Sequence, residues 1–164
     1  MKNIILIGMP GAGKSTVGVV LAKILGKDFE DIDLIIQRKE KRRLQNIIDA
    51  DGLQKFLEIE ENALLDADFN NTVIATGGSA VMSEKGMLNL KKNSIVVYLK
   101  LSLEAVTKRI HNLSSRGIAM EKGQTLSDIF EIRKNLYEKY ADIVIDCENC
   151  SIEQVIEKVR TALD

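Results

Sequence analysis

Apolar and polar residues divide the chain into alternating segments of two kinds. Short apolar runs, such as residues 4–7 and 95–99, are typical of strands that are covered on both faces of a sheet. Between them lie longer segments whose apolar residues recur at helical spacing. This pattern predicts strands at 3–8, 28–31, 72–76, 94–99 and 142–146, and helices at 14–25, within 34–65, and at 83–91, 103–110, 126–140 and 152–163. Such alternation is typical of an α/β fold with a parallel sheet, helices on both faces, and ligands at the carboxyl ends of the strands.

The length of 164 residues fits one domain with a proper core, and the composition narrows the partners. The formal net charge of −1 gives no support for a nucleic-acid partner, which would need a basic surface. No apolar run is long enough to cross a membrane, and the chain starts with a strand rather than a signal peptide. Cys147 and Cys150 are too few for a disulfide framework. We therefore expect a cytoplasmic, monomeric protein without nucleic-acid or membrane partners.

The segment between the first predicted strand and helix carries the most specific motif of the chain. It reads Gly-x4-Gly-Lys-Ser, with Gly8, Gly13, Lys14 and Ser15 at the defining positions. Between a strand and a helix, this spacing predicts a P-loop, whose backbone N–H groups and helix N-terminus bind phosphate oxygens. Lys14 is expected to reach the β- and γ-phosphates and Ser15 to ligate Mg²⁺, and the alternative is a glycine-rich turn without a ligand. The residues that we expect to contact the nucleotide here are Gly11, Ala12, Gly13, Lys14, Ser15 and Thr16.

Asp31 and Asp33 follow the second predicted strand, at the edge of the sheet where the P-loop is expected. On an extended segment, side chains at positions i and i+2 point the same way. One carboxylate could hold Mg²⁺ through water while the other accepts a proton from an attacking hydroxyl. The alternatives are a solvated acidic loop, or Asp33 as the N-cap of the following helix.

Two further features are expected at the same edge of the sheet. Gly77 and Gly78 end the third predicted strand and would let a ligand approach the backbone closely, although a plain turn is the alternative. Arg109 and Arg116 flank a polar segment, and Arg133 lies on the next predicted helix. Arginines can stabilise a transferring phosphate or bind a carboxylate, whereas surface ion pairs are the alternative for each of them.

The order of these motifs resembles the shikimate kinase family, one of the nucleoside-monophosphate-kinase-like P-loop kinases. Gly-x4-Gly-Lys-Ser-Thr, Asp-x-Asp, Gly-x3-Phe, Ala-Thr-Gly-Gly, a lid arginine and Arg-x3-Tyr follow one another at matching spacing along the whole chain. The resemblance implies a three-layer P-loop fold with a five-stranded parallel sheet, in a single domain of residues 1–164. It also implies a helical substrate-binding segment at about 33–65, a lid loop at about 112–124, and ATP and Mg²⁺ as cofactors.

The resemblance also implies roles for single residues. On the nucleotide side, Arg109 would pack on adenine, while Ser15 would ligate Mg²⁺ directly and Asp31 through water. Asp33 would hold the accepting hydroxyl and take its proton, and Arg116 would act at the transferring phosphate. The implied catalytic residues are Lys14, Asp33 and Arg116, and the implied substrate-binding residues are Asp33, Phe56, Gly77, Gly78, Ser79 and Arg133.

The acceptor half of the chain departs from the family pattern. Leu57 stands where the family has an arginine that binds the substrate carboxylate, so Glu60, three residues on, loses a partner. Ser79 stands where the family has the third glycine of Gly-Gly-Gly. Arg42 and Arg43 are the candidates to replace the missing arginine.

The intact nucleotide half predicts an enzyme that transfers a phosphoryl group from ATP to a hydroxyl of a small hydroxy acid. Shikimate is the first candidate acceptor. Another small hydroxy acid, such as homoserine, is the alternative, because the altered pocket suits a smaller or differently shaped molecule. A further alternative is a P-loop nucleotide-binding protein without kinase activity, although the chain lacks the Asn-Lys-x-Asp motif expected of a GTPase.

Overall fold

A five-stranded sheet forms the centre of the molecule in the computed structural model, which describes residues 2–110 and 116–164. All pairings are parallel and the strand order is β2-β3-β1-β4-β5, which confirms the predicted sheet. In the register, Ile5 of the central strand lies opposite Ile74 on one side and Val96 on the other. The strands are β1 (Asn3–Ile7), β2 (Asp28–Asp31), β3 (Thr72–Ala75), β4 (Ser94–Lys100) and β5 (Ile143–Asp146).

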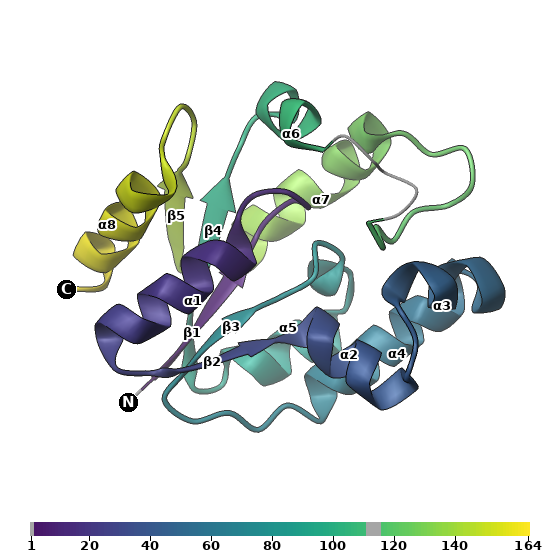
Figure 1. The fold of residues 1–164 in the computed structure, drawn as a ribbon, viewed down its shortest axis with the longest axis horizontal. Helices are drawn as coiled ribbons and strands as arrows, with labels where there is room; N and C mark the ends of the chain where they lie inside the picture. The colour runs from purple at the N-terminus through teal and green to yellow at the C-terminus, as the bar shows by residue number, and fades with distance from the viewer. Residues whose placement is uncertain (1, 111–115) are drawn as a thin grey trace.

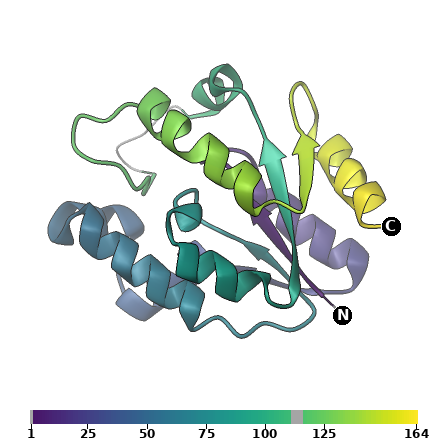
Figure 2. The same cartoon turned by 180° about the vertical axis from the view of Figure 1, so that it is seen from behind.

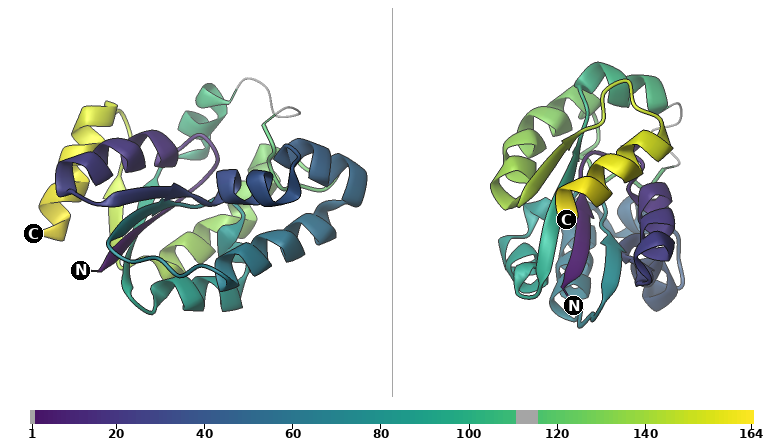
Figure 3. Two further views of the ribbon diagram at one scale, coloured as in Figure 1. Left: turned by 60° about the horizontal axis from the view of Figure 1, so that its bottom comes forward. Right: turned by 90° about the vertical axis from the view of Figure 1, so that its left-hand side faces the viewer.

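Helices cover both faces of this sheet, as the alternating pattern predicts. The helices are α1 (Lys14–Leu25), α2 (Ile32–Glu40), α3 (Leu44–Asp51), α4 (Leu53–Leu65), the short 3₁₀ helix η1 (Ala80–Met82), α5 (Glu84–Lys91), α6 (Leu103–Arg109), α7 (Leu126–Tyr140) and α8 (Ile152–Leu163). The α1 and α8 helices lie on one face, and α5 and α7 lie on the other (Figures 1 and 2). Figure 3 shows the resulting three layers end-on. Because helices cover both of its faces, β1 is apolar nearly throughout, and Ile5 and Leu6 are fully buried.

The segment predicted to bind substrate folds as three helices beside the sheet, α2, α3 and α4 (Figure 1). Gly52 separates α3 from α4 with φ at 86°, a left-handed value that glycine adopts without strain, which confirms the predicted break. The helical segment begins at Ile32, slightly earlier than expected.

Of the lid predicted at 112–124, residues 112–115 lie outside the described residues. Residues 116–124 form an irregular segment that leads into α7. Gly117 ties this segment to α3, because its N–H donates a hydrogen bond of 3.2 Å to Gln45 Oε1. Across residues 2–110 and 116–164, no helix has the length and apolar character needed to cross a membrane.

Candidate active site

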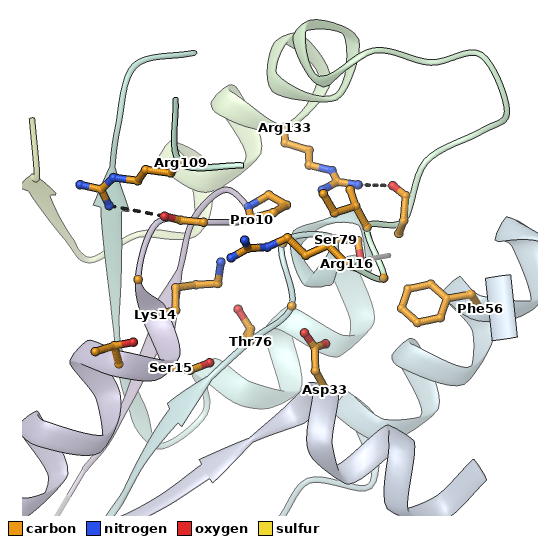
Figure 4. Close-up of a pocket in the computed structure, with 18 of the residues that line it drawn as sticks. Pro10, Lys14, Ser15, Asp33, Phe56, Thr76, Ser79, Arg109, Arg116 and Arg133 are labelled. Carbon is orange, nitrogen blue, oxygen red and sulfur yellow. Dashed lines mark hydrogen bonds between the residues drawn. The ribbon is translucent and has the colours of Figure 1, made fainter. Parts of the chain in front are cut away.

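A cavity of about 390 Å³ opens at the carboxyl ends of the strands, between the P-loop, α2, α4 and α7 (Figure 4). It brings together most of the residues that the sequence singles out. Ala12 and Asp31 are the exceptions: Ala12 is buried, and Asp31 does not line the cavity but accepts a hydrogen bond from Ser15. The predicted residues that line the cavity are Gly11, Gly13, Lys14, Ser15, Thr16, Asp33, Phe56, Gly77, Gly78, Ser79, Arg109, Arg116 and Arg133.

The P-loop has the geometry of an anion site. Gly11 and Gly13 have φ values of 81° and 90°, which only glycine adopts readily. Gly13 precedes α1 without any side-chain cap, so the first N–H groups of that helix remain available to phosphate oxygens. The Lys14 ammonium donates to the carbonyl oxygens of Gly8 at 2.8 Å and Met9 at 2.9 Å. These groups fit a nucleotide phosphate.

Burial changes the protonation of Lys14. Its side chain is 7% exposed, and loss of hydration lowers its pKa to about 8, although the nearby Asp33 carboxylate works in the opposite direction. An incoming phosphate would favour the charged ammonium, because opposite charges stabilise one another strongly where water is excluded.

Ser15 and Asp31 join the P-loop to the end of β2. The Ser15 hydroxyl donates to Asp31 Oδ2 at 2.6 Å. Within the described residues, no group of three or more His, Cys, Asp or Glu side chains could hold a metal ion. A Mg²⁺ ion here would therefore take Ser15, water and phosphate oxygens as ligands, which is the usual arrangement for this ion.

The local geometry of the Asp-x-Asp motif differs from the prediction. The two aspartates do not share an extended segment: Asp31 ends β2, and Asp33 lies in the first turn of α2. Asp31 is the N-cap of this helix, because its Oδ1 accepts from the N–H groups of Asp33 at 3.0 Å and Leu34 at 3.3 Å. The alternative that Asp33 is the N-cap was therefore wrong. Its carboxylate lines the cavity instead.

The Asp33 carboxyl has the protonation behaviour of a buried acid. Burial and the nearby negative charge of Asp31 raise its pKa to about 6, against the opposing effect of the Lys14 ammonium. Gly77 leaves room for it, since a Cβ on that glycine would lie 2.7 Å from Asp33 Oδ1. A carboxyl with a pKa near the working pH is suited to general-base chemistry.

Glu60 is a residue of this region that the sequence interpretation assigned no role. It is 2% exposed, and Ser79 Oγ donates to its Oε1 at 2.7 Å, so Ser79 supplies a partner for the glutamate. Burial raises the pKa of Glu60 to about 7, although the Ser79 hydrogen bond opposes this shift. The sequence contained one signal for a role of Glu60. The glutamate follows Phe56 by about one helical turn, so it lies on the buried face of α4.

The three arginines all line the cavity, which argues against the alternative of surface ion pairs. Figure 4 shows the Arg116 side chain extending toward Lys14. Arg109 Nη1 contacts the Gly11 carbonyl oxygen at 3.4 Å. Arg133 is 4% exposed, and its Nη2 donates to the Ala119 carbonyl oxygen at 2.5 Å.

Neither Arg42 nor Arg43, which lie between α2 and α3, replaces the arginine missing at Leu57. Leu57 packs against the hydrophobic core. Arg42 forms an ion pair with Asp51 at 2.5 Å, and neither Arg42 nor Arg43 lines the cavity. Apolar and small residues that have no predicted role also contribute to the walls, namely Pro10, Thr76, Gly117, Ile118, Ala119 and Ile152.

A P-loop that faces a buried carboxyl and several arginines across one cavity defines a P-loop phosphotransferase. Comparison with known proteins shows to which family this phosphotransferase belongs. The family model for shikimate kinase matches residues 10–164, and the chain belongs to the shikimate kinase family. It is a kinase that acts on a hydroxyl group, and its family uses ATP with Mg²⁺.

Individual relatives cover almost the whole chain. A shikimate kinase from Sulfurihydrogenibium sp. is 36% identical, with 99% of this chain and 98% of that protein covered. A human protein named threonine synthase-like 1 is also 36% identical over 99% of this chain, which corresponds to 22% of that protein. Among solved structures, shikimate kinase from Acinetobacter baumannii in complex with shikimate has a TM-score of 0.91 at 31% identity, with 99% and 93% of the chains covered.

Proposed function

We propose that this enzyme phosphorylates a hydroxyl group of a small carboxylic acid, with shikimate as the first candidate acceptor. The observation that supports this most is the shared cavity of Lys14, Asp33 and Arg133, which brings a phosphate site, a buried carboxyl and a buried guanidinium together. The similarity to a shikimate-bound structure at 31% identity supports the choice of acceptor.

In the proposed reaction, the acceptor oxygen forms a bond to the γ-phosphorus of ATP as the bond to the bridging oxygen breaks. ADP leaves, and Asp33 accepts the proton of the acceptor hydroxyl. Lys14 and Arg116 stabilise the negative charge on the transferring group. Mg²⁺, held beside Ser15 and Asp31, would neutralise phosphate charge.

Binding of the two substrates is divided between the two ends of the cavity. The P-loop residues, including Thr16, would hold the phosphates, and Arg109 would pack on adenine. Arg133 would bind the acceptor carboxylate through Nη1, the nitrogen that has no hydrogen-bond partner among the described residues. Phe56, Gly77, Gly78 and Ser79 would form the walls around the acceptor.

Homoserine is the second candidate acceptor, because Leu57 removes one positive charge from the acceptor end. Homoserine has fewer carbon atoms than shikimate, and it keeps one carboxylate for Arg133.

Release of ADP from Mg·ATP, measured with shikimate and homoserine side by side, tests the proposal. We expect turnover that depends on an added acceptor and that Lys14→Ala abolishes. Lys23→Ala, which changes a lysine near the end of the same helix, is the control. Acceptor-independent ADP release, or no release with any hydroxy acid, would contradict the proposed function.

A further inference from the structure

Two buried polar atoms at the acceptor end of the cavity have no hydrogen-bond partner among the described residues. They are Glu60 Oε2 and Arg133 Nη1, one an acceptor and the other a donor. Each belongs to a side chain that is otherwise engaged, Glu60 with Ser79 and Arg133 with Ala119. A buried charged group that lacks a partner is costly, so such a pair indicates a ligand that satisfies both atoms.

The free oxygen of Glu60 lies close to the carboxylate of Asp33. A Cβ on Gly77 would lie 2.8 Å from Glu60 Oε2 and 2.7 Å from Asp33 Oδ1, so both oxygens surround one point beside the glycine. Asp33 and Gly77 both line the cavity. Glu60 itself does not line the cavity, so it contacts a ligand group held against Asp33 only when its side chain moves toward Gly77.

The described part of the chain provides no cation that pairs with Glu60. Leu57, three residues earlier on α4, is apolar, and Arg42 is paired with Asp51. Arg133 and Lys14 are near enough to lower the pKa of Glu60, but neither forms a hydrogen bond with it: Lys14 Nζ and Arg133 Nη2 donate to backbone carbonyls, and Arg133 Nη1 has no partner among the described residues. The acceptor end therefore has two buried side chains for a ligand: the Glu60 carboxyl for a positively charged group and the Arg133 guanidinium for a negatively charged group.

We propose that Glu60 binds the ammonium group of a hydroxylated α-amino acid, whose carboxylate is bound by Arg133 and whose hydroxyl lies at Asp33. The inference rests on the proposed kinase function and specifies which residue would bind the ammonium group of a zwitterionic acceptor such as homoserine. Ser79 is a positioning residue in this arrangement, because its hydroxyl fixes Oε1 and leaves Oε2 for the ligand.

Proton release gives this assignment a second signature. Glu60 has a pKa of about 7, so near neutral pH a part of the protein carries it protonated. A bound ammonium favours the carboxylate, and its binding therefore releases protons to the buffer.

Calorimetric titration of the nucleotide-free protein with homoserine and with 4-hydroxybutyrate tests the proposal. The two ligands share a hydroxyl, a carboxylate and a chain length and differ in the ammonium group. We expect homoserine to bind about tenfold to a hundredfold more tightly, which corresponds to one hydrogen bond to a charged group. We also expect homoserine binding to release protons, detected as a heat that depends on the ionisation enthalpy of the buffer.

Glu60→Gln should bring the two affinities within about threefold of each other and suppress the proton release. Glu58→Gln is the matched control on the same helix, because Glu58 is 54% exposed and pairs with Lys55. It should keep the preference for homoserine.

Equal affinities of the wild-type protein for the two ligands would overturn the proposal, and this comparison needs no variant. Retention of the preference in folded Glu60→Gln would overturn it as well. A measurement of shikimate turnover with Mg·ATP distinguishes failure of the Glu60 proposal from failure of the proposed kinase function. If shikimate is phosphorylated while homoserine has no advantage over 4-hydroxybutyrate, the kinase function stands and ammonium recognition by Glu60 is wrong. If no hydroxy acid is phosphorylated, the proposed function itself fails.

Discussion

The hydroxyl of Ser15 donates a hydrogen bond of 2.6 Å to Asp31 Oδ2, and this contact links the P-loop to the end of β2. The same carboxyl caps α2 through its other oxygen. One side chain thus fixes the residue expected to ligate Mg²⁺ and also starts the helix that carries Asp33.

Asp31→Asn separates these two roles. Asparagine caps helices as well as aspartate does, so the free energy of unfolding should stay within about 0.5 kcal/mol of wild type. Loss of the negative charge should raise the Mg²⁺ concentration for half-maximal activity by about tenfold, the usual effect of removing a partner of a metal ligand. Titration of activity with Mg²⁺ measures this. Asp28→Asn, at the exposed start of β2, is the control, and an unchanged Mg²⁺ requirement in Asp31→Asn would refute the role of Asp31.

Asp33→Asn should lower kcat by about 10²–10⁴, because the amide keeps the size of the side chain but cannot accept the hydroxyl proton. ATP binding should change little, since the P-loop is intact. Steady-state kinetics with the better of the two acceptors measures both parameters. Asp68→Asn, on an exposed loop, should behave as wild type. A kcat near the wild-type value in Asp33→Asn would exclude it as the base.

The pH dependence of kcat/KM should be bell-shaped. Activity should rise through about pH 6, as Asp33 loses its proton, and fall above about pH 8, as free Lys14 loses its charge. In Asp33→Asn, the activity that remains should no longer rise through about pH 6. If that rise persists unchanged, a different group controls it.

Stability should also depend on pH through Glu60. Its pKa is about 7 in the folded protein against 4.5 for the ordinary side chain, so between these values the folded state binds more protons than the unfolded state. The free energy of unfolding therefore falls as pH rises through this window, by roughly 1.4 kcal/mol per pKa unit at most. Asp33 acts in the same direction between 3.8 and about 6.

Urea unfolding of wild type and Glu60→Gln at about pH 5 and pH 8 tests this effect. The loss of stability from the lower to the higher pH should be smaller in the variant, because glutamine does not titrate. Glu58→Gln should match wild type at both values, since Glu58 is exposed. An identical loss in all three proteins would show that Glu60 is not the source.

The sequence predicted the fold well and predicted the segment between β1 and α1 that carries the P-loop motif, because both depend on local patterns. The continuous apolar residues of β1 identify a strand covered on both faces, and the P-loop lies in one unbroken segment up to Ser15. The order in which the strands pair required the structure, although their parallel direction followed from the alternation with helices.

The acceptor half was harder to predict, because its contacts join residues far apart in the sequence. Asp33 lines the cavity, but the extended geometry predicted for Asp31 and Asp33 was wrong, because Asp31 caps α2 and Asp33 lies in its first turn. The hydrogen bond between Ser79 and Glu60 spans 19 residues and exists only after the loop following β3 packs on α4. No local pattern contains that contact.

A ³¹P NMR spectrum of the protein with Mg·ATP and a hydroxy-acid acceptor tests phosphoryl transfer to a hydroxyl group most directly. We predict that the γ-phosphate signal of ATP is replaced by that of a phosphate monoester of shikimate or homoserine, that ADP forms, and that Asp33→Asn slows this conversion strongly. Conversion of the γ-phosphate to inorganic phosphate alone, or an unchanged ATP spectrum with both acceptors, would contradict this prediction.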